Sequence, residues 1–121
     1  MSKTALVVDD SLMIRRMVSN SMKQAGFEVT EAANGKEGLK ALEGRAFQII
    51  LTDINMPEMD GFDFIAGARA HAAHKFTPML VLTTEAEGKM IDRAKALGAT
   101  GWIVKPFQPE KVMSVVNRVV P

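Results

Sequence analysis

Residues 49–61, IILTDINMPEMDG, decide how the chain folds. A short, unbroken apolar run gives way at Thr52 and Asp53 to a segment that contains a proline and a glycine. Such a run is typical of a strand that is buried on both faces of a parallel sheet. The aspartate at its end either caps the next element or takes part in chemistry, and the rest of the chain helps to choose between these roles.

Outward from this stretch, short apolar runs alternate with helical patterns along the whole chain. We expect strands at residues 4–10, 27–32, 47–53, 78–83 and 101–105, and helices at residues 11–25, 35–43, 62–70, 85–97 and from Pro109 onward. Gly26 and Gly98 end two of these helices, and Asn34-Gly35 predicts a turn. A proline at the first helical position suits the last helix.

Apolar residues recur every three or four positions in each expected helix, which predicts one inward face per helix. The expected inward residues are Ile14, Met17, Val18, Met22, Ala25, Leu39, Leu42, Phe62, Ile65, Ala68, Met90, Ala94, Leu97, Val112, Met113, Val116 and Val119. Five strand–helix units indicate an α/β fold, a doubly wound parallel sheet with right-handed crossovers and helices on both faces. The alternation leaves the order of the strands open.

Length and composition narrow the class of protein. With 121 residues, 47% of them hydrophobic, the chain is expected to form a single domain, residues 1–121, with a sizeable core. A net charge of +1 gives no reason to expect a nucleic-acid partner, and the lack of cysteine excludes disulfides and thiol chemistry. The apolar runs are too short to span a membrane, and the start, MSKTALVVDD, does not resemble a signal peptide. We therefore expect a soluble cytoplasmic domain.

Polar residues capable of chemistry stand at the carboxyl ends of four expected strands. They are Asp9 and Asp10 after the first strand, Asp53 after the third, Thr83 and Thr84 after the fourth, and Lys105 with Pro106 after the fifth. In parallel α/β sheets, ligands bind outside these carboxyl ends. Three carboxylates, a hydroxyl and an ammonium therefore meet at one edge if the first and third strands are neighbours.

Clustered carboxylates need a cation. Two of them about 4 Å apart disfavour each other by roughly 4 kcal/mol at an effective dielectric constant of about 20. Lys105 supplies one positive charge, and Mg²⁺, a hard ion that takes few protein ligands and several waters, suits the remainder. A carboxylate beside Mg²⁺ and an ammonium is prepared to attack a phosphoryl group, with the Thr83 hydroxyl donating to one phosphoryl oxygen. Asp53 is thus a candidate nucleophile.

Each of these residues also has a simpler interpretation. Asp10 or Ser11 can cap the first helix, Thr83 or Thr84 can cap the fourth, Asp53 can be a turn residue, and Lys105 can be a solvated strand end. One site explains the gathering of all of them at one edge better than four separate structural roles do.

His71 and His74 lie three positions apart near a helix end. Because no carboxylate is expected on that face, we interpret both as solvated residues and not as metal ligands.

Four segments resemble the motifs of response-regulator receiver domains of the chemotaxis CheY type. They are VVDDS near the start, LTDINMPEMDG, VLTTEA and GATGWIVKPF, which keep the order and spacing of the family along the whole chain. The resemblance implies a (βα)5 flavodoxin-like sheet with strand order 2-1-3-4-5. It also implies a cis peptide bond between Lys105 and Pro106.

The resemblance assigns roles to the polar residues. Asp53 would accept a phosphoryl group from a histidine kinase similar to CheA, and Thr83 and Lys105 would bind the phosphoryl oxygens. The implied Mg²⁺ ligands are Asp10 and Asp53 directly, the backbone carbonyl of Asn55, and Asp9 through water. The domain would then be no enzyme beyond Mg²⁺-dependent self-phosphorylation and autodephosphorylation.

The resemblance also implies an output. Trp102 takes the place of the switch aromatic, which is Tyr or Phe in most relatives. Ile91 and Lys95, four residues apart, share the outward face of the fourth helix. Together with the fifth strand and fifth helix, this face would bind a target such as the flagellar motor switch protein. Asn55 and Glu85 would border the path of attacking water, as in fast-hydrolysing chemotaxis members.

Alternative functions fit the residues less well. A phosphatase of the haloacid dehalogenase kind needs a second aspartate where Asn55 stands. A flavin-binding module needs a phosphate loop where Asp9 and Asp10 would repel phosphate, and a receiver fold that serves only as a scaffold does not explain the complete chemical set. Within the receiver family, a phosphate sink or a receiver of another pathway remains an alternative to a motor-binding protein. In either case we expect a monomer with no membrane or nucleic-acid partner.

Overall fold

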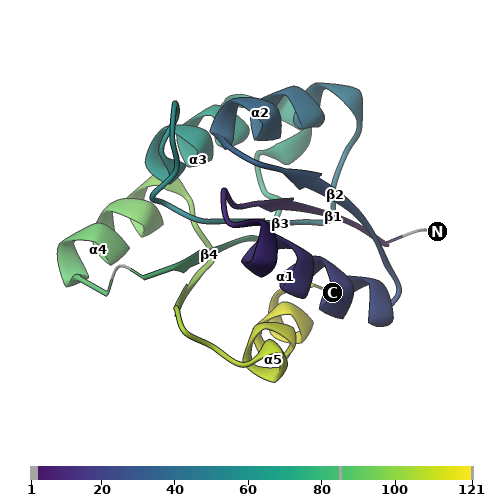
Figure 1. Cartoon of the computed structure of the whole chain (residues 1–121). Helices are drawn as coiled ribbons and strands as arrows, with labels where there is room; N and C mark the ends of the chain where they lie inside the picture. Colours follow the sequence, from purple (N-terminus) through teal and green to yellow (C-terminus); the bar gives the residue numbers. More distant parts are fainter. Residues whose placement is uncertain (1–2, 85, 121) are drawn as a thin grey trace.

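The computed structural model describes residues 3–84 and 86–120, which form alternating strands and helices (Figure 1). The strands are β1 (Lys3–Val8), β2 (Phe27–Ala32), β3 (Ile49–Thr52), β4 (Met79–Thr83) and β5 (Gly101–Val104). The helices are α1 (Leu12–Gln24), α2 (Gly35–Gly44), α3 (Gly61–Ala70), α4 (Gly88–Leu97) and α5 (Pro109–Val119), with a short 3-10 helix, η1, at Ala72–His74. Every expected strand and helix is present, and only their ends differ from the prediction.

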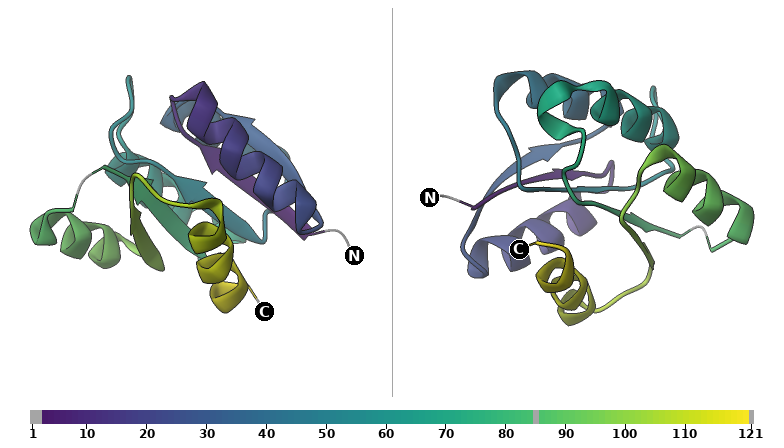
Figure 2. Two further views of the ribbon diagram at one scale, coloured as in Figure 1. Left: turned by 60° about the horizontal axis from the view of Figure 1, so that its bottom comes forward. Right: turned by 180° about the vertical axis from the view of Figure 1, so that it is seen from behind.

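The five strands form one parallel sheet in the order β2-β1-β3-β4-β5. Since β1 pairs with β2 on one side and with β3 on the other, the strand order reverses at β1. The fold class and the order 2-1-3-4-5 are therefore confirmed. Figure 1 and the two turned views of Figure 2 show α1 and α5 on one face of the sheet and α2, α3 and α4 on the other.

Each face of the sheet carries its own apolar core, because successive residues of a strand point to opposite faces. Leu6 and Val8 pack into the core under α2, α3 and α4, whereas Ala5 and Val7 pack into the core under α1 and α5. All four residues of β3 are buried, as predicted for a strand that is covered on both sides. The two cores together fix the positions of the strands and therefore of the carboxyl ends of the strands.

Three described helices begin with a side-chain cap, and that of α3 is Asp60, which accepts a hydrogen bond from the Asp63 amide at 2.9 Å. The Ser11 hydroxyl caps α1 by accepting a hydrogen bond from the Ile14 amide at 3.3 Å, so Asp10 is not the cap. Asn34, which was expected in a turn, caps α2 by accepting from the Glu37 amide at 2.9 Å. Asp10 is thereby left available for another role.

The fourth helix begins later than predicted. It starts at Gly88, and the residue before it, Glu87, makes no side-chain cap bond. The expected capping role of Thr83 or Thr84 is therefore wrong, because both lie well before the helix. Glu85, which the sequence placed in this helix and beside the path of attacking water, lies outside the described residues.

The predicted inward faces hold for most helix positions. Ala25 is the exception, since α1 ends at Gln24 and leaves Ala25 exposed. Ser19 and Phe64 are fully buried although the prediction did not include them. Phe64 reaches α2, where a β-carbon on Gly38 would lie 2.6 Å from its ring, so the absent side chain of that glycine lets the two helices approach closely.

The longest described helix, α1, has 13 residues and a length of about 20 Å. The apolar interior of a membrane is about 30 Å thick. Within residues 3–84 and 86–120, no helix has the length and apolar character needed to cross it.

His74 is buried, which corrects the prediction that both histidines are solvated. Its side chain is 0% exposed, and its Nε2 accepts a hydrogen bond from the Phe47 amide at 3.1 Å. The ring of the half-buried His71 lies 5.2 Å away between centroids, and the Arg69 guanidinium donates to the His74 carbonyl at 2.8 Å. Burial lowers the pKa of His74, and the charges of His71 and Arg69 lower it further. This histidine is therefore a neutral acceptor in the core at neutral pH.

The pH dependence of stability tests this assignment. Since folding lowers the pKa of His74, its contribution to stability is present in full above the unfolded pKa of 6.5 and is lost as the pH falls. The free energy of unfolding should decline below about pH 6.5, with a slope that approaches about 1.4 kcal/mol per pH unit for one proton. His74→Gln keeps an acceptor for the Phe47 amide but does not titrate, so urea unfolding should give a flatter curve. Equal slopes in the two proteins would contradict the assignment.

Candidate functional site

The parallel sheet brings Asp9 and Asp53 to one edge. Val8 of β1 pairs with Thr52 of β3, so the aspartates that follow them leave the sheet side by side. The Asp53 amide also donates to the Val8 carbonyl at 3.0 Å, which continues the pairing beyond the strands. The condition that the sequence left open, that the first and third strands are neighbours, is thus met at the point where the strand order reverses.

Three carboxylates converge at this edge. One oxygen each of Asp9, Asp10 and Asp53 lies within 4.8 Å of the others. Asp9 is 3% exposed and Asp53 is 6% exposed, whereas Asp10 is open to solvent. A hard divalent ion that binds oxygen and keeps several waters suits two buried carboxylates and one exposed carboxylate. The residues present therefore fit Mg²⁺.

Lys105 supplies positive charge between two of these carboxylates. Its Nζ donates to Asp9 Oδ2 at 2.8 Å and to Asp53 Oδ2 at 3.0 Å. Burial acts to lower the pKa of Lys105, but the hydrogen bonds and charges of the two aspartates outweigh it and raise the pKa. The pKa of Asp9 is also raised. Here burial is the main cause, and it outweighs the hydrogen bonds from Lys105 and Ser11, which lower the pKa. Lys105 is therefore charged at neutral pH.

Backbone groups hold the Asp53 carboxylate in place. Its Oδ1 accepts hydrogen bonds from the amides of Ile54 at 2.6 Å and Asn55 at 3.4 Å. Gly61 closes this loop, because its own amide donates to the Ile54 carbonyl at 2.8 Å. A β-carbon on Gly61 would collide with the Asp53 carbonyl oxygen, so the close approach requires glycine. Gly61, at the end of the segment 49–61, thus allows the loop to fold closely against Asp53.

Two residues at the site were not predicted. Arg15 of α1 donates to the Asp9 carbonyl at 2.7 Å and to a carboxylate oxygen of Glu31 at 3.0 Å. The two side chains meet only because β2 lies beside β1, so the sequence carries no local signal for the pair.

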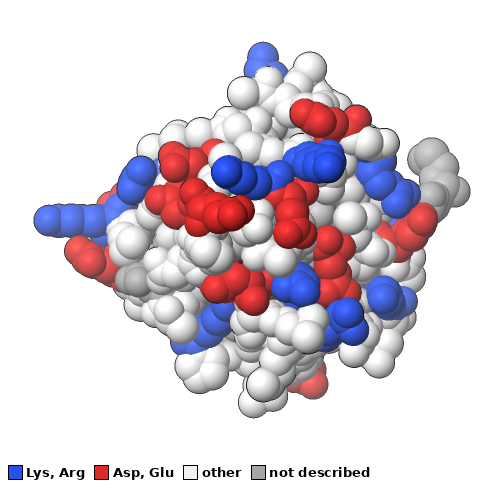
Figure 3. Space-filling view, turned by 45° about the horizontal axis from the view of Figure 1, so that its top comes forward, with Lys and Arg blue, Asp and Glu red and all other residues white. Residues whose placement is uncertain are grey.

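Lysine and arginine side chains lie among the acidic ones on the face shown in Figure 3.

Thr83, the other predicted phosphoryl-binding residue, also lies at this edge. It is buried at the end of β4, and its carbonyl accepts a hydrogen bond from the Lys105 amide at 2.7 Å. Asn55 is exposed in the loop that follows Asp53. The peptide bond between Lys105 and Pro106 is cis, as the resemblance implied.

The predicted output residues lie on β5 and α4. Trp102 is half-buried beside Val81 of β4 and packs against the core that α2, α3 and α4 cover. On α4, Ala94 points into this core, Lys95 is exposed and Ile91 is half-buried. The sequence placed Ile91 on the outward face of this helix, but its side chain is only partly exposed.

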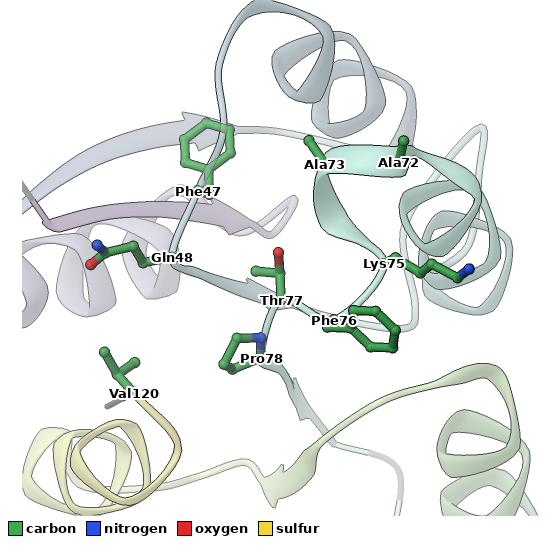
Figure 4. A pocket seen from close by; sticks show the side chains of 9 residues that line it. All are labelled: Phe47, Gln48, Ala72, Ala73, Lys75, Phe76, Thr77, Pro78 and Val120. Atoms are coloured by element: carbon green, nitrogen blue, oxygen red, sulfur yellow. The ribbon is translucent and has the colours of Figure 1, made fainter.

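A separate hollow of about 380 Å³ lies at the other end of the sheet, where β3 and β4 begin (Figure 4). Its lining residues are Phe47, Gln48, Ala72, Ala73, Lys75, Phe76, Thr77, Pro78 and Val120. None of the predicted site residues is among them, so this hollow is distinct from the acidic edge.

Comparison with known proteins agrees with the geometry. The family model of the response regulator receiver domain matches residues 5–117. A probable chemotaxis protein CheY of Rhizobium etli is 32% identical over 115 residues, which cover 94% of this chain and 89% of that protein. The chemotaxis protein CheY1 of Helicobacter pylori is 38% identical over 107 residues, 87% of this chain and 86% of that protein.

Among solved structures, chemotaxis protein CheY4 of Vibrio cholerae has a TM-score of 0.94 and 45% sequence identity, over 98% of this chain and 99% of that chain. Its similarity extends over the same sheet order and helices that place the acidic edge. The chain belongs to the response regulator receiver domain family, among the CheY-type chemotaxis regulators of two-component signalling.

Proposed function

We propose that Asp53 accepts a phosphoryl group from a histidine kinase similar to CheA, and that this reaction is the input of a chemotaxis signal. The supporting observation is the position of Lys105 Nζ, 3.0 Å from Asp53 Oδ2 within a cluster of three carboxylates. Phosphoryl transfer needs positive charge where the phosphoryl oxygens arrive. The edge provides an ammonium for this purpose and carboxylate oxygens for a divalent ion.

In the proposed reaction an oxygen of Asp53 attacks phosphorus, and the bond between phosphorus and the kinase histidine nitrogen breaks. The imidazole leaves with that electron pair, and the product is an acyl phosphate on Asp53. Lys105 pairs with one phosphoryl oxygen, and the Thr83 hydroxyl donates to another. In this proposal the phosphorylated chain is the signal, and water later hydrolyses the acyl phosphate.

The proposed Mg²⁺ ligands are Asp10 and Asp53 directly, the backbone carbonyl of Asn55, and Asp9 through water. When bound, the ion supplies charge neutralisation at the phosphoryl oxygens. Asp10 suits this role because it is exposed and because Ser11, its neighbour, already caps α1.

The proposed output is a change in the surface formed by α4, β5 and α5. Phosphorylation draws the Thr83 hydroxyl toward the phosphoryl group, and Trp102 turns into the space behind it. This is a shift between two populated states, driven by the difference in phosphoryl contacts between them. Ile91 and Lys95 belong to the surface that changes, and its target is a protein such as the flagellar motor switch. A phosphate sink, or a target in another pathway, is the alternative output.

We further propose that residues 1–121 act as a single receiver domain, as a monomer in the cytoplasm. The single sheet with a core on each face supports the single domain.

Substitution of the acceptor tests the proposed reaction. Incubation with acetyl phosphate and Mg²⁺ should add one phosphoryl group, which mass spectrometry detects and which base removes, as expected for an acyl phosphate. Asp53→Asn keeps the shape but removes the nucleophile, so labelling should be lost. Asp63→Asn, which changes an exposed carboxylate on α3, is the matched control and should label like the wild type. Equal labelling of Asp53→Asn would reject the assignment.

Two neighbouring substitutions separate metal binding from helix capping. Asp10→Ala should weaken Mg²⁺ binding at least about tenfold, since even supporting partners of metal ligands contribute this much. Without Mg²⁺ the variant should be no less stable than the wild type, because like-charge repulsion at the edge is relieved. Ser11→Ala should show the reverse: Mg²⁺ affinity is kept, and the free energy of unfolding falls by about 1 kcal/mol. A loss of stability in Asp10→Ala that equals the loss in Ser11→Ala would show a structural role for Asp10.

The fluorescence of Trp102 reports the proposed switch. The chain has one tryptophan and no tyrosine, so its emission comes from this residue alone. Phosphorylation should change the emission or its quenching. Thr83→Ala should reduce this change while Asp53 still accepts phosphate, whereas Thr84→Ala, at an exposed neighbour, should behave like the wild type. An unchanged signal in fully phosphorylated wild-type protein would favour the phosphate sink.

A further inference from the structure

We propose that Arg15 is a positioning residue of the acidic edge, which aims the Asp10 carboxylate by holding the peptide between Asp9 and Asp10. This inference rests on the proposed function, in which Asp10 binds Mg²⁺. It adds to that function a residue of α1 and its anchor, Glu31 of β2.

The contacts of Arg15 link three elements. Its Nη1 donates to the Asp9 carbonyl at 2.7 Å, and its Nε donates to Glu31 Oε1 at 3.0 Å. The Arg15 side chain is 14% exposed, and that of Glu31 is 22% exposed. Both hydrogen bonds come from a charged guanidinium and are partly shielded from water. They are therefore stronger than neutral hydrogen bonds on an open surface. A planar guanidinium can serve both acceptors at once, which a lysine ammonium cannot do in the same geometry.

The Asp9 carbonyl controls Asp10 because a peptide unit is rigid. The carbonyl of Asp9, the amide of Asp10 and the α-carbon of Asp10 lie in one plane. The Asp10 side chain is exposed, so packing does little to direct it. Its direction therefore depends on the orientation of this peptide, which Arg15 holds from the carbonyl side.

The remaining polar atoms of Asp9 are held as well. Its amide donates to the Ala32 carbonyl at 3.1 Å, its Oδ1 accepts from the Ser11 amide at 2.9 Å, and its Oδ2 accepts from Lys105 Nζ at 2.8 Å. Arg15 completes this set at the carbonyl oxygen. The turn that carries both acidic residues is thus fixed by bonds from β2, α1 and the end of β5.

Arg16 provides a matched comparison. It carries the same charge and bonds the same Glu31 oxygen at 3.2 Å, but its side chain is 64% exposed. Within residues 3–84 and 86–120, only Arg15 of the two reaches the Asp9 carbonyl. Removal of either arginine makes the edge more negative, which by charge alone attracts Mg²⁺ more strongly. Loss of positioning has the opposite sign, so the direction of the change distinguishes the two effects.

The test is the Mg²⁺ affinity of the full, unphosphorylated chain, measured by isothermal titration calorimetry with MgCl₂. Arg15→Gln should weaken binding about tenfold, a usual effect of losing a group that supports a metal ligand. Arg16→Gln should bind as well as the wild type or slightly better. Arg15→Lys, which keeps the charge, should also bind more weakly than the wild type. Equal affinities for Arg15→Gln and Arg16→Gln would overturn the inference.

Urea unfolding without Mg²⁺ confirms that each variant is folded before titration. If Arg15→Gln does not fold, Arg15→Lys carries the test, because it keeps the positive charge and loses the planar fork that holds Glu31 and the Asp9 carbonyl together. Weaker Mg²⁺ binding than the wild type supports the inference, and unchanged binding overturns it. A wild-type protein that binds no Mg²⁺ would instead overturn the proposed metal site, and this inference with it.

Discussion

The ion pair of Lys105 with Asp9 and Asp53 is the interaction on which the site depends. All three side chains are nearly buried, and charges in such surroundings are costly unless they are paired. The pairing joins residues 96 and 52 positions apart, so it ties the end of β5 to the ends of β1 and β3. One ammonium does not balance three carboxylates, and the edge is left with a demand for further positive charge. That demand is the physical basis for a divalent ion at this edge.

Backbone groups surround the Asp53 carboxylate. Gly61 lets the loop after β3 fold against Asp53, and the amides of that loop bind one of its carboxylate oxygens. The α4 side differs: the helix starts without a side-chain cap, and Ala94 is the residue that it buries in the core. Elements with little burial open most easily. The acidic edge is therefore held by more backbone contacts than the start of α4, which has no side-chain cap.

Most of the fold was predictable from local patterns. Apolar patterns placed all five strands and five helices, because burial on one face leaves a repeat in the sequence and burial on both faces leaves an unbroken apolar run. One error came from an interaction between distant residues, and another from the start of a helix. His74 is buried because the Phe47 amide, 27 positions away, uses its Nε2 as an acceptor. The predicted Thr83 or Thr84 cap failed because the chain does not become helical until Gly88.

By itself, the sequence determined the strand–helix units and the aspartates, threonines and lysine that follow the strands, since a strand and its last residue are local features. It also singled out Asp53, at the end of a strand covered on both faces. Only the tertiary structure decided which of these residues meet. The place of β1 between β2 and β3 brings Asp9 beside Asp53 and Arg15 beside Glu31. Apolar periodicity is the same for every strand order, so it cannot encode contacts that depend on that order.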